Sequence, residues 1–258
     1  MNIWQALVLG VVQGLCEFLP VSSSGHLVLF QNALGINETE LLLDTCLHLG
    51  TLAALALVFY KDIWQLLRRP LSPMVYKLVI ATIPAVVATL LFGDFFESAF
   101  SGNLLGVGFL LTAAILFSTR FIRPTQSEPG YKSALFAGVM QAIAILPGIS
   151  RSGSTIAGGM YAGQRQYASA RFAFLMAIPA ILGSVVYQGY KLATGAVVFD
   201  LPILPLIVGT LAAAVSSLVA IRFMLNLLNK HGMTGFAAYT LVLGILILVD
   251  QYATHFIF

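Results

Sequence analysis

Two stretches of the chain decide its fold: GVVQGLCEFLPVSSSGH at residues 10–26 and GVMQAIAILPGISRSGS at residues 138–154. Each runs from Gly-Val-x-Gln through a Leu-Pro pair into a turn rich in serine and glycine. Because proline interrupts an apolar helix and serine favours the start of a new one, each stretch predicts a helix that breaks and restarts. Polar side chains gather at both breaks. Such groups are costly in lipid, so they predict a functional site.

The composition places these breaks in a membrane protein. Of 258 residues, 59% are hydrophobic and only 9% are charged, and the mean hydropathy is +0.93. Several continuous apolar runs approach or reach bilayer-spanning length, which predicts an all-α polytopic integral membrane protein. A membrane β-barrel is excluded, because its strands would alternate polar and apolar residues. We expect the lipid bilayer as a partner and no nucleic acid, because the chain has no basic stripe or recognised motif for it.

Two minor features fit this class. No basic residue precedes Lys61, so we expect the apolar N-terminal segment to be retained and not cleaved as a signal peptide. Cys16 and Cys46 lie within apolar segments, which favours buried thiols over a disulfide or a metal site.

Six apolar runs predict transmembrane spans, at residues 45–66, 74–93, 104–121, 170–190, 203–225 and 236–256. The two broken stretches, extended to 3–33 and 132–163, are expected to form re-entrant helix pairs; a single kinked span is the alternative. The chain then forms a single membrane domain of two repeats, about 1–124 and 132–258, joined near 124–131. Each repeat is a hairpin followed by three spans. Because three is odd, the repeats are predicted to have inverted topology.

Basic residues predict the orientation of this arrangement. Eleven fall on one face, only Lys191 falls on the other, and Arg151 lies inside. The eleven are Lys61, Arg68, Arg69, Lys77, Arg120, Arg123, Lys132, Arg165, Arg171, Arg222 and Lys230. The positive-inside rule therefore predicts both termini and the first hairpin on the outer face. If the hairpins were full spans, the basic loops around Lys61 and Lys230 would lie on opposite faces of the membrane. The positive-inside rule therefore favours the re-entrant interpretation.

The first hairpin carries a carboxylate, hydroxyls and an imidazole. Gln13 and Glu17 are four residues apart, so they share a helix face just before the break. They either belong to the site or simply hydrogen-bond a neighbouring helix. After the break, hydroxyls can cap the restarted helix, and His26 in its first turn is a candidate to carry a proton or activate a serine. The hydroxyls belong to Ser22, Ser23 and Ser24.

The second hairpin predicts an anion-binding turn. Free backbone N–H groups at a helix start favour phosphate, and a guanidinium adds forked donors that match phosphate oxygens. The residues concerned are Ser150, Arg151, Ser152, Gly153 and Thr155. The alternative role for Arg151 is an ion pair with Glu17, which a ligand could open. His48, four residues after Asp44, is a weaker candidate for the site, and Trp4 and Trp64 are explained as interface anchors.

Together these groups favour hydrolysis of a phosphoester or pyrophosphate whose lipid tail stays in the bilayer. A transporter or lipid flippase is the rival interpretation, because inverted repeats with broken helices are typical of transporters. A purely structural membrane protein would leave the serine, arginine and histidine cluster unexplained.

The chain also resembles the undecaprenyl-diphosphate phosphatase family of the BacA type over essentially its whole length. Two motifs carry the resemblance: Gln13-x-x-x-Glu17 continuing into Pro-Val-Ser-Ser-Ser-Gly-His, and Pro147-Gly-Ile-Ser-Arg-Ser-Gly153. The resemblance implies removal of the terminal phosphate from undecaprenyl diphosphate, bacitracin resistance, an inner-membrane location, a divalent cation such as Mg²⁺ or Ca²⁺, and a homodimer.

By motif position the resemblance implies essential roles for Glu17, Ser23, His26 and Arg151, and phosphate contacts for Ser150 and Thr155. In the expected mechanism Arg151 and the second turn hold the pyrophosphate, Ser23 attacks, and His26 with Glu17 manages protons or a cation. Attack by water is the alternative. Glu17 is the best candidate metal ligand. The family pattern admits both glutamate and glutamine at position 13, and because this chain has Gln13, a two-carboxylate metal site is less secure.

Overall fold

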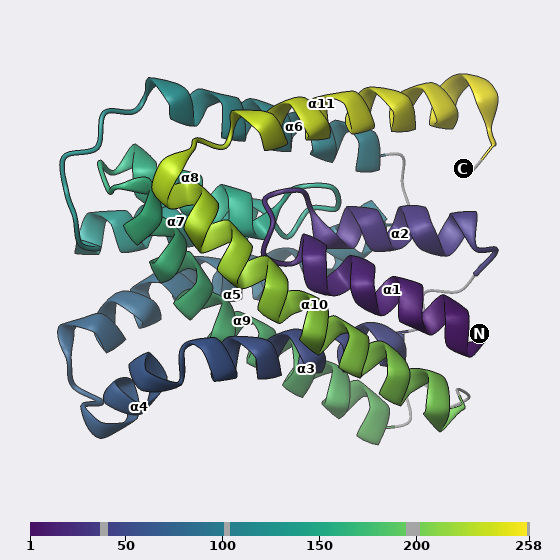
Figure 1. Cartoon of the computed structure of the whole chain (residues 1–258), viewed down its shortest axis with the longest axis horizontal. Coiled ribbons are helices and arrows are strands. Elements are labelled where there is room, and N and C mark those ends of the chain that lie inside the picture. The colour runs from purple at the N-terminus through teal and green to yellow at the C-terminus, as the bar shows by residue number, and fades with distance from the viewer. Residues whose placement is uncertain (37–40, 101–103, 195–201, 257–258) are drawn as a thin grey trace.

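The computed structural model describes residues 1–36, 41–100, 104–194 and 202–256, and within them all regular structure is helical apart from a bridge between Gln126 and Gln164 (Figure 1). The helices are α1 (Ile3–Cys16), α2 (Ser23–Ala33), α3 (Leu41–Val58), α4 (Tyr60–Arg68), α5 (Pro73–Phe100), α6 (Leu105–Ser118), η1 (Thr119–Phe121), α7 (Tyr131–Ile143), α8 (Arg151–Tyr161), α9 (Gln166–Ala193), α10 (Ile203–Lys230), α11 (Thr234–Val249) and η2 (Asp250–Thr254).

Both predicted helix breaks are confirmed. In the first hairpin α1 ends at Cys16 and α2 begins at Ser23; in the second α7 ends at Ile143 and α8 begins at Arg151. Within each hairpin the two helices pack against each other. Each connection contains the expected proline, which lacks a backbone N–H and so cannot continue the helical hydrogen bonding.

The predicted spans are only partly reproduced. Within the described residues, four apolar helices are long enough to cross a membrane, at Pro73–Phe96, Gln166–Lys191, Ile203–Lys230 and Thr234–Thr254. The segment predicted as 104–121 is a shorter apolar helix, Leu105–Phe121. The segment predicted as a span at 45–66 consists of two helices, Leu42–Val58 and Tyr60–Arg68, with a bend of 79° between them, so it is a broken span or a re-entrant pair.

The bend falls where the apolar run ends and where α4 contacts α9. The apolar part ends at Val58, and α4 beyond it carries Lys61, Asp62 and Arg68. Asp62 pairs with Arg171 of α9 through contacts of 3.1 and 3.2 Å. Charged, exposed helices of this kind are typical of a membrane surface, and Figure 1 places α4 at one end of the molecule.

The first helix of each hairpin packs on a long helix from the opposite half of the chain. Helix α1 packs on α10, where Gly10 faces the backbone of Gly209, and α7 packs on α5, where Gly138 faces the backbone of Ala81. A Cβ atom at either hairpin glycine would collide with that backbone. Small residues let membrane helices approach closely, so these glycines fix the position of both hairpins.

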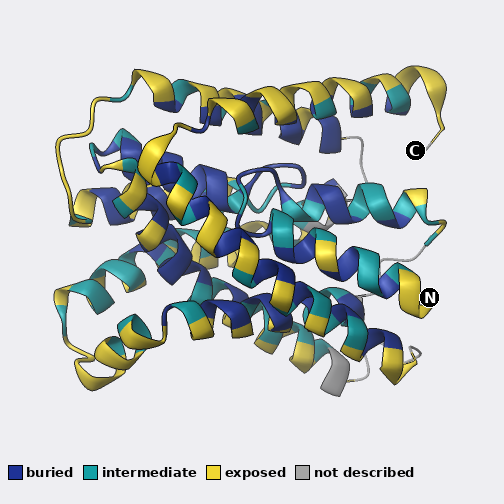
Figure 2. Ribbon diagram, in the orientation of Figure 1, coloured by how far each residue is buried: buried dark blue, intermediate teal, exposed yellow. Residues whose placement is uncertain are grey.

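Burial is concentrated around the two turns. Figure 2 shows buried residues gathered at the centre, where the turns lie, and exposed residues along the outer faces of the helices. Phe18, next to Glu17, is buried edge-on against Phe174 of α9 with ring centroids 5.5 Å apart. Figure 1 also places both termini at one end of the molecule, and α4 with the η1–α7 connection at the other. Cys16 and Cys46 are free thiols and are half-buried, where the sequence predicted buried ones.

Candidate active site

The end of α1 presents a buried carboxylate. Gln13 and Glu17 lie one helical turn apart as predicted, and the Gln13 Nε2 group donates a hydrogen bond of 3.1 Å to Glu17 Oε2. Only 3% of the Glu17 side chain is exposed. Gln13 Oε1 is also buried and has no hydrogen-bond partner among the described residues. An amide oxygen without a partner therefore lies beside the carboxylate.

The first turn of α2 adds hydroxyls. Ser22 caps α2, because its Oγ accepts the backbone N–H of Gly25 at 3.3 Å. Ser23, the first residue of the helix, donates a hydrogen bond of 2.6 Å from its Oγ to Glu17 Oε2. Ser24 is half-buried and its Oγ lies 3.4 Å from Ser22 Oγ. The helix break thus brings Ser23 back onto the carboxylate that precedes it.

The second hairpin repeats this cap with different chemistry. Ser150 Oγ accepts the backbone N–H of Gly153 at 3.1 Å and lies 3.3 Å from Ser152 Oγ. In the first hairpin, Ser22 makes the corresponding contacts with Gly25 and Ser24. Arg151 is the first residue of α8, so it occupies the place that Ser23 occupies in α2. The two hairpins therefore present a hydroxyl and a guanidinium from equivalent positions.

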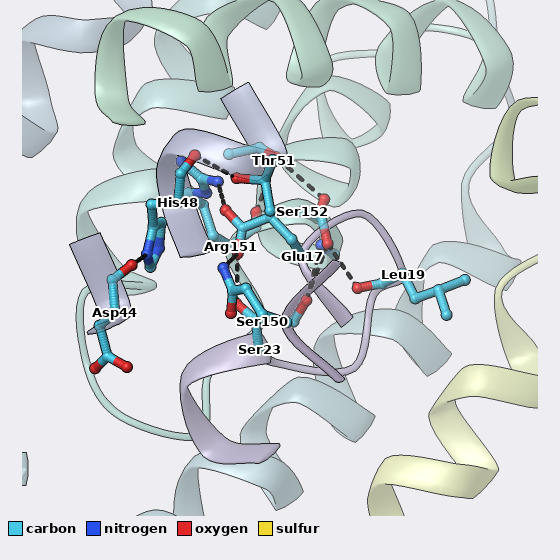
Figure 3. A network of polar contacts seen from close by, with 12 residues as sticks. Glu17, Leu19, Ser23, Asp44, His48, Thr51, Ser150, Arg151 and Ser152 are labelled. Carbon is cyan, nitrogen blue, oxygen red and sulfur yellow. Dashed lines mark hydrogen bonds and ion pairs between the residues drawn. The ribbon is translucent and has the colours of Figure 1, made fainter. Parts of the chain in front are cut away.

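The two hairpins meet at these residues (Figure 3). Arg151 Nη2 forms an ion pair with Glu17 Oε1, which joins residues 134 positions apart in the sequence. Ser152 Oγ donates to the backbone carbonyl of Leu19 at 2.9 Å. Gly153 packs against Pro20 so closely that a larger side chain would not fit. Arg151 keeps 24% of its side chain exposed. Part of the Arg151 side chain thus remains accessible from outside the protein.

His26 lies apart from the carboxylate. Its Nδ1 is 2.7 Å from the backbone oxygen of Ser22, and its Nε2 is 2.7 Å from the hydroxyl of Tyr239 on α11. The hydrogen bonds of the ring therefore run to Ser22 and Tyr239, and none runs to Ser23 or Glu17. The direct serine–histidine contact that the sequence suggested is not present in this arrangement.

His48 comes closer to the carboxylate than the sequence indicated. It is half-buried on α3 and within electrostatic range of Glu17, and Figure 3 shows it beside the ion pair. Its ring is held by a contact of 2.7 Å between Nδ1 and the backbone oxygen of Asp44, so the predicted pairing involves the main chain of Asp44. Thr51 Oγ1 donates to the His48 carbonyl at 2.8 Å.

The remaining candidate, Thr155, forms its hydrogen bonds within its own helix. Thr155 Oγ1 donates to the backbone oxygens of Arg151 and Ser152, at 2.8 and 3.1 Å. It therefore stabilises the first turn of α8. A direct phosphate contact would require this hydroxyl to rotate away from its backbone partners.

Comparison with known proteins identifies the family. Residues 6–246 match the family described as "Bacitracin resistance protein BacA". A relative named undecaprenyl-diphosphatase from Carboxydothermus hydrogenoformans is 42% identical over 261 residues, covering 99% of this chain and 100% of the relative. The chain belongs to the BacA family.

Two further relatives in this comparison carry the same name. Undecaprenyl-diphosphatase 3 from Bacillus cereus is 40% identical over 260 residues, covering 99% of this chain and 100% of the relative. Undecaprenyl-diphosphatase from Halothermothrix orenii is 39% identical over 257 residues, covering 96% and 98%. The similarity thus spans both hairpins and all the helices between them.

Sequence reasoning missed two supporting residues of this BacA-family site. Thr112 of α6 accepts the backbone N–H of Ser150 at 2.9 Å and donates to the Gly148 oxygen at 3.0 Å, which fixes the second turn. Tyr239 bonds His26. Both lie in apolar helices far from the motifs, and neither local spacing nor composition distinguishes them from packing residues.

Proposed function

We propose that this protein is a membrane hydrolase that removes the terminal phosphate from undecaprenyl diphosphate, and that it thereby recycles the monophosphate carrier of cell-wall synthesis and contributes to bacitracin resistance. The single observation that carries the proposal is the convergence of Arg151, Glu17 and Ser23 from two hairpins in a member of the BacA family. This combination supplies an anion-binding group, a proton acceptor and a nucleophile at one place.

Arg151 and the first turn of α8 are proposed to hold the diphosphate. A guanidinium has five N–H donors, and only one of its nitrogens is engaged by Glu17 in the ion pair recorded here. The first backbone N–H groups of a helix and its dipole also favour an anion. An arriving phosphate would compete with Glu17 for Arg151, so substrate binding would loosen the ion pair and leave the carboxylate available as a base.

Ser23 is proposed to attack the terminal phosphorus. Its Oγ forms the new bond to phosphorus as the bond between that phosphorus and the bridging oxygen breaks, which releases undecaprenyl phosphate. Glu17 takes the Ser23 proton along the 2.6 Å hydrogen bond. Water then hydrolyses the phosphoserine, releasing inorganic phosphate and restoring the hydroxyl. In the competing version Glu17 activates a water molecule that attacks phosphorus directly.

The described residues at the site offer few ligands for a divalent cation. The described residues contain no group of three His, Cys, Asp or Glu side chains able to hold a metal ion. However, Mg²⁺ commonly uses one or two carboxylates together with substrate phosphates. Glu17 and the unpartnered Gln13 Oε1 would then hold the cation beside the diphosphate. When bound, Mg²⁺ or Ca²⁺ would neutralise charge on the phosphate oxygens.

We also propose that both hairpins are re-entrant and that the chain is an inverted repeat. The reciprocal packing of α1 on α10 and of α7 on α5 supports this, since it is what a two-fold relation between halves requires. With the basic α4 and η1–α7 end facing the cytoplasm, the termini lie outside and the site opens to the outer face of the inner membrane. The homodimer remains a prediction, to be tested by the mass of the detergent-solubilised complex.

Phosphate release by the purified protein tests the activity. In detergent with Mg²⁺ or Ca²⁺, we expect inorganic phosphate from undecaprenyl diphosphate and from the short analogue farnesyl diphosphate. The matched control is Glu17→Gln, which keeps the side-chain shape but removes the base. Folded protein that releases no phosphate would overturn the proposal and favour the flippase alternative. The names of the relatives give no support to that alternative.

Labelling of single cysteines in intact cells tests the orientation. In a variant lacking Cys16 and Cys46, Asn2→Cys should react with a membrane-impermeant thiol reagent, whereas Gly232→Cys, between α10 and α11, should be protected. The reverse pattern would refute the orientation without affecting the proposed activity.

A further inference from the structure

We propose that Tyr239 of α11 is a positioning residue for the reaction: it holds the His26 ring, which holds the strained Ser22 backbone, which in turn sets Ser23 against Glu17. This inference rests on the proposed function, since the effect that matters is on the Ser23 hydroxyl. It assigns a role to a side chain that lies more than two hundred residues from the first motif.

The hydrogen bonds determine how the His26 ring is held. A backbone carbonyl only accepts hydrogen bonds, so the 2.7 Å contact to the Ser22 oxygen requires the proton to be on Nδ1. In the neutral ring Nε2 is then an acceptor, and the Tyr239 hydroxyl donates to it at 2.7 Å. Tyr239 thus selects the tautomer that can bond Ser22.

Aromatic contacts fix the same ring from two sides. The ring planes of His26 and Tyr239 lie within 12° of each other at a centroid distance of 5.8 Å, and Phe109 of α6 meets His26 edge-on at 5.4 Å. Only 4% of His26 is exposed. Because α6 and α11 pack along each other, as Figure 1 shows, the ring is held by a rigid helix pair outside the hairpin.

The backbone that His26 holds is strained. Ser22 has φ of 70° and ψ of 98°, in a region that residues other than glycine rarely adopt. Its carbonyl receives two hydrogen bonds from His26, one from the backbone N–H at 3.2 Å and one from the ring. The neighbouring residue is Ser23, so this conformation decides where the Ser23 hydroxyl points.

The second hairpin provides a comparison within the same molecule. Its cap, Ser150, has φ of −71° and ψ of 117°, which is ordinary extended backbone. Ser154 stands where His26 stands in the first hairpin, and its buried Oγ has no hydrogen-bond partner among the described residues. The strained cap and the anchored histidine therefore occur together, in the hairpin that presents the hydroxyl to the carboxylate.

The test is Tyr239→Phe, which keeps the ring and its packing and removes the hydroxyl donor. Losing one hydrogen bond of ordinary strength lowers kcat by about 3- to 10-fold, while KM for farnesyl diphosphate stays within about twofold because the phosphate-binding turn is untouched. The matched control is Tyr252→Phe in η2, where the ring is exposed and the rate should stay at the wild-type value. An unchanged kcat in Tyr239→Phe, or a rise in KM alone, would overturn the proposal.

Two further measurements separate positioning from general destabilisation. In a double-mutant cycle, Tyr239→Phe should have little additional effect on kcat in a His26→Ala background, because Tyr239 acts through His26; independent effects would refute the coupling. Nitrogen-15 spectra of the side chains of the four histidines, with His26 assigned by His26→Gln, should show Nδ1 protonated and a shift at Nε2 in Tyr239→Phe. This readout needs no activity, so it stands even if the proposed reaction fails.

Discussion

Replacing Ser23 by alanine tests the proposed chemistry most directly. The hydroxyl donates to a carboxylate of which only 3% is exposed, at 2.6 Å. A hydrogen bond to a charged group contributes about 1.5–3 kcal/mol. If Ser23 only orients Glu17, Ser23→Ala should therefore lower kcat by about 10- to 150-fold. If Ser23 is the nucleophile, the covalent route is lost and the decrease should be on the order of 10⁴-fold or more. We expect the larger effect.

The assay is the initial rate of phosphate release from farnesyl diphosphate in detergent, at equal amounts of folded protein. Acid quenching with substrate labelled on its terminal phosphate should trap phosphoserine in the wild type and none in Ser23→Ala. Thr89→Ala is the control, because it removes an exposed hydroxyl whose hydrogen bond goes to its own helix. A Ser23→Ala decrease below about 150-fold, without a trapped intermediate in the wild type, would refute the serine mechanism and favour direct attack by water.

Three other substitutions test the rest of the site. Arg151→Lys keeps the charge but loses the forked donors, so kcat/KM should fall by about tenfold or more; a value near wild type in steady-state kinetics would contradict the role of Arg151 in holding phosphate. Gln13→Glu should lower the Mg²⁺ or Ca²⁺ concentration needed for half-maximal activity, measured by titration after chelation, whereas no metal dependence before or after the change would argue against the cation. Gly14→Ala should destabilise the protein by about 1–3 kcal/mol, because its Cβ would collide with Ser216 and the Ala213 carbonyl. Gly183→Ala, which meets only open space, is the stability control in thermal unfolding.

The local features of the site could be predicted from the sequence. Pro20 and Pro147 interrupt their helices whatever surrounds them, because proline lacks the N–H that a helix needs. The hydroxyl caps of α2 and α8, and the Gln13–Glu17 pair one turn apart, depend on atoms only a few residues away. Such short-range geometry is encoded by residue type and spacing alone.

Packing decided other features that the sequence did not indicate. The apolar run at 45–66 bends at Phe59, and α4 beyond the bend pairs with α9. His26 was expected to work beside the hydroxyls, yet the aromatic rings of α6 and α11 orient it toward the Ser22 backbone and Tyr239. Neither partner helix carries a local signal for this contact.

The sequence by itself determined a helical membrane protein with two broken hairpins, a carboxylate and hydroxyl in one and an arginine in the other. Only the tertiary structure decided that Arg151 reaches Glu17 across 134 positions in the sequence, and that Tyr239 holds the orientation of the His26 ring. Helix breaks and caps depend on neighbouring residues, whereas these contacts depend on how the helices pack. The close approaches of Gly10 to α10 and of Gly138 to α5 position the two hairpins, and the packing of α6 on α11 positions Tyr239, so both contacts are properties of the whole assembly.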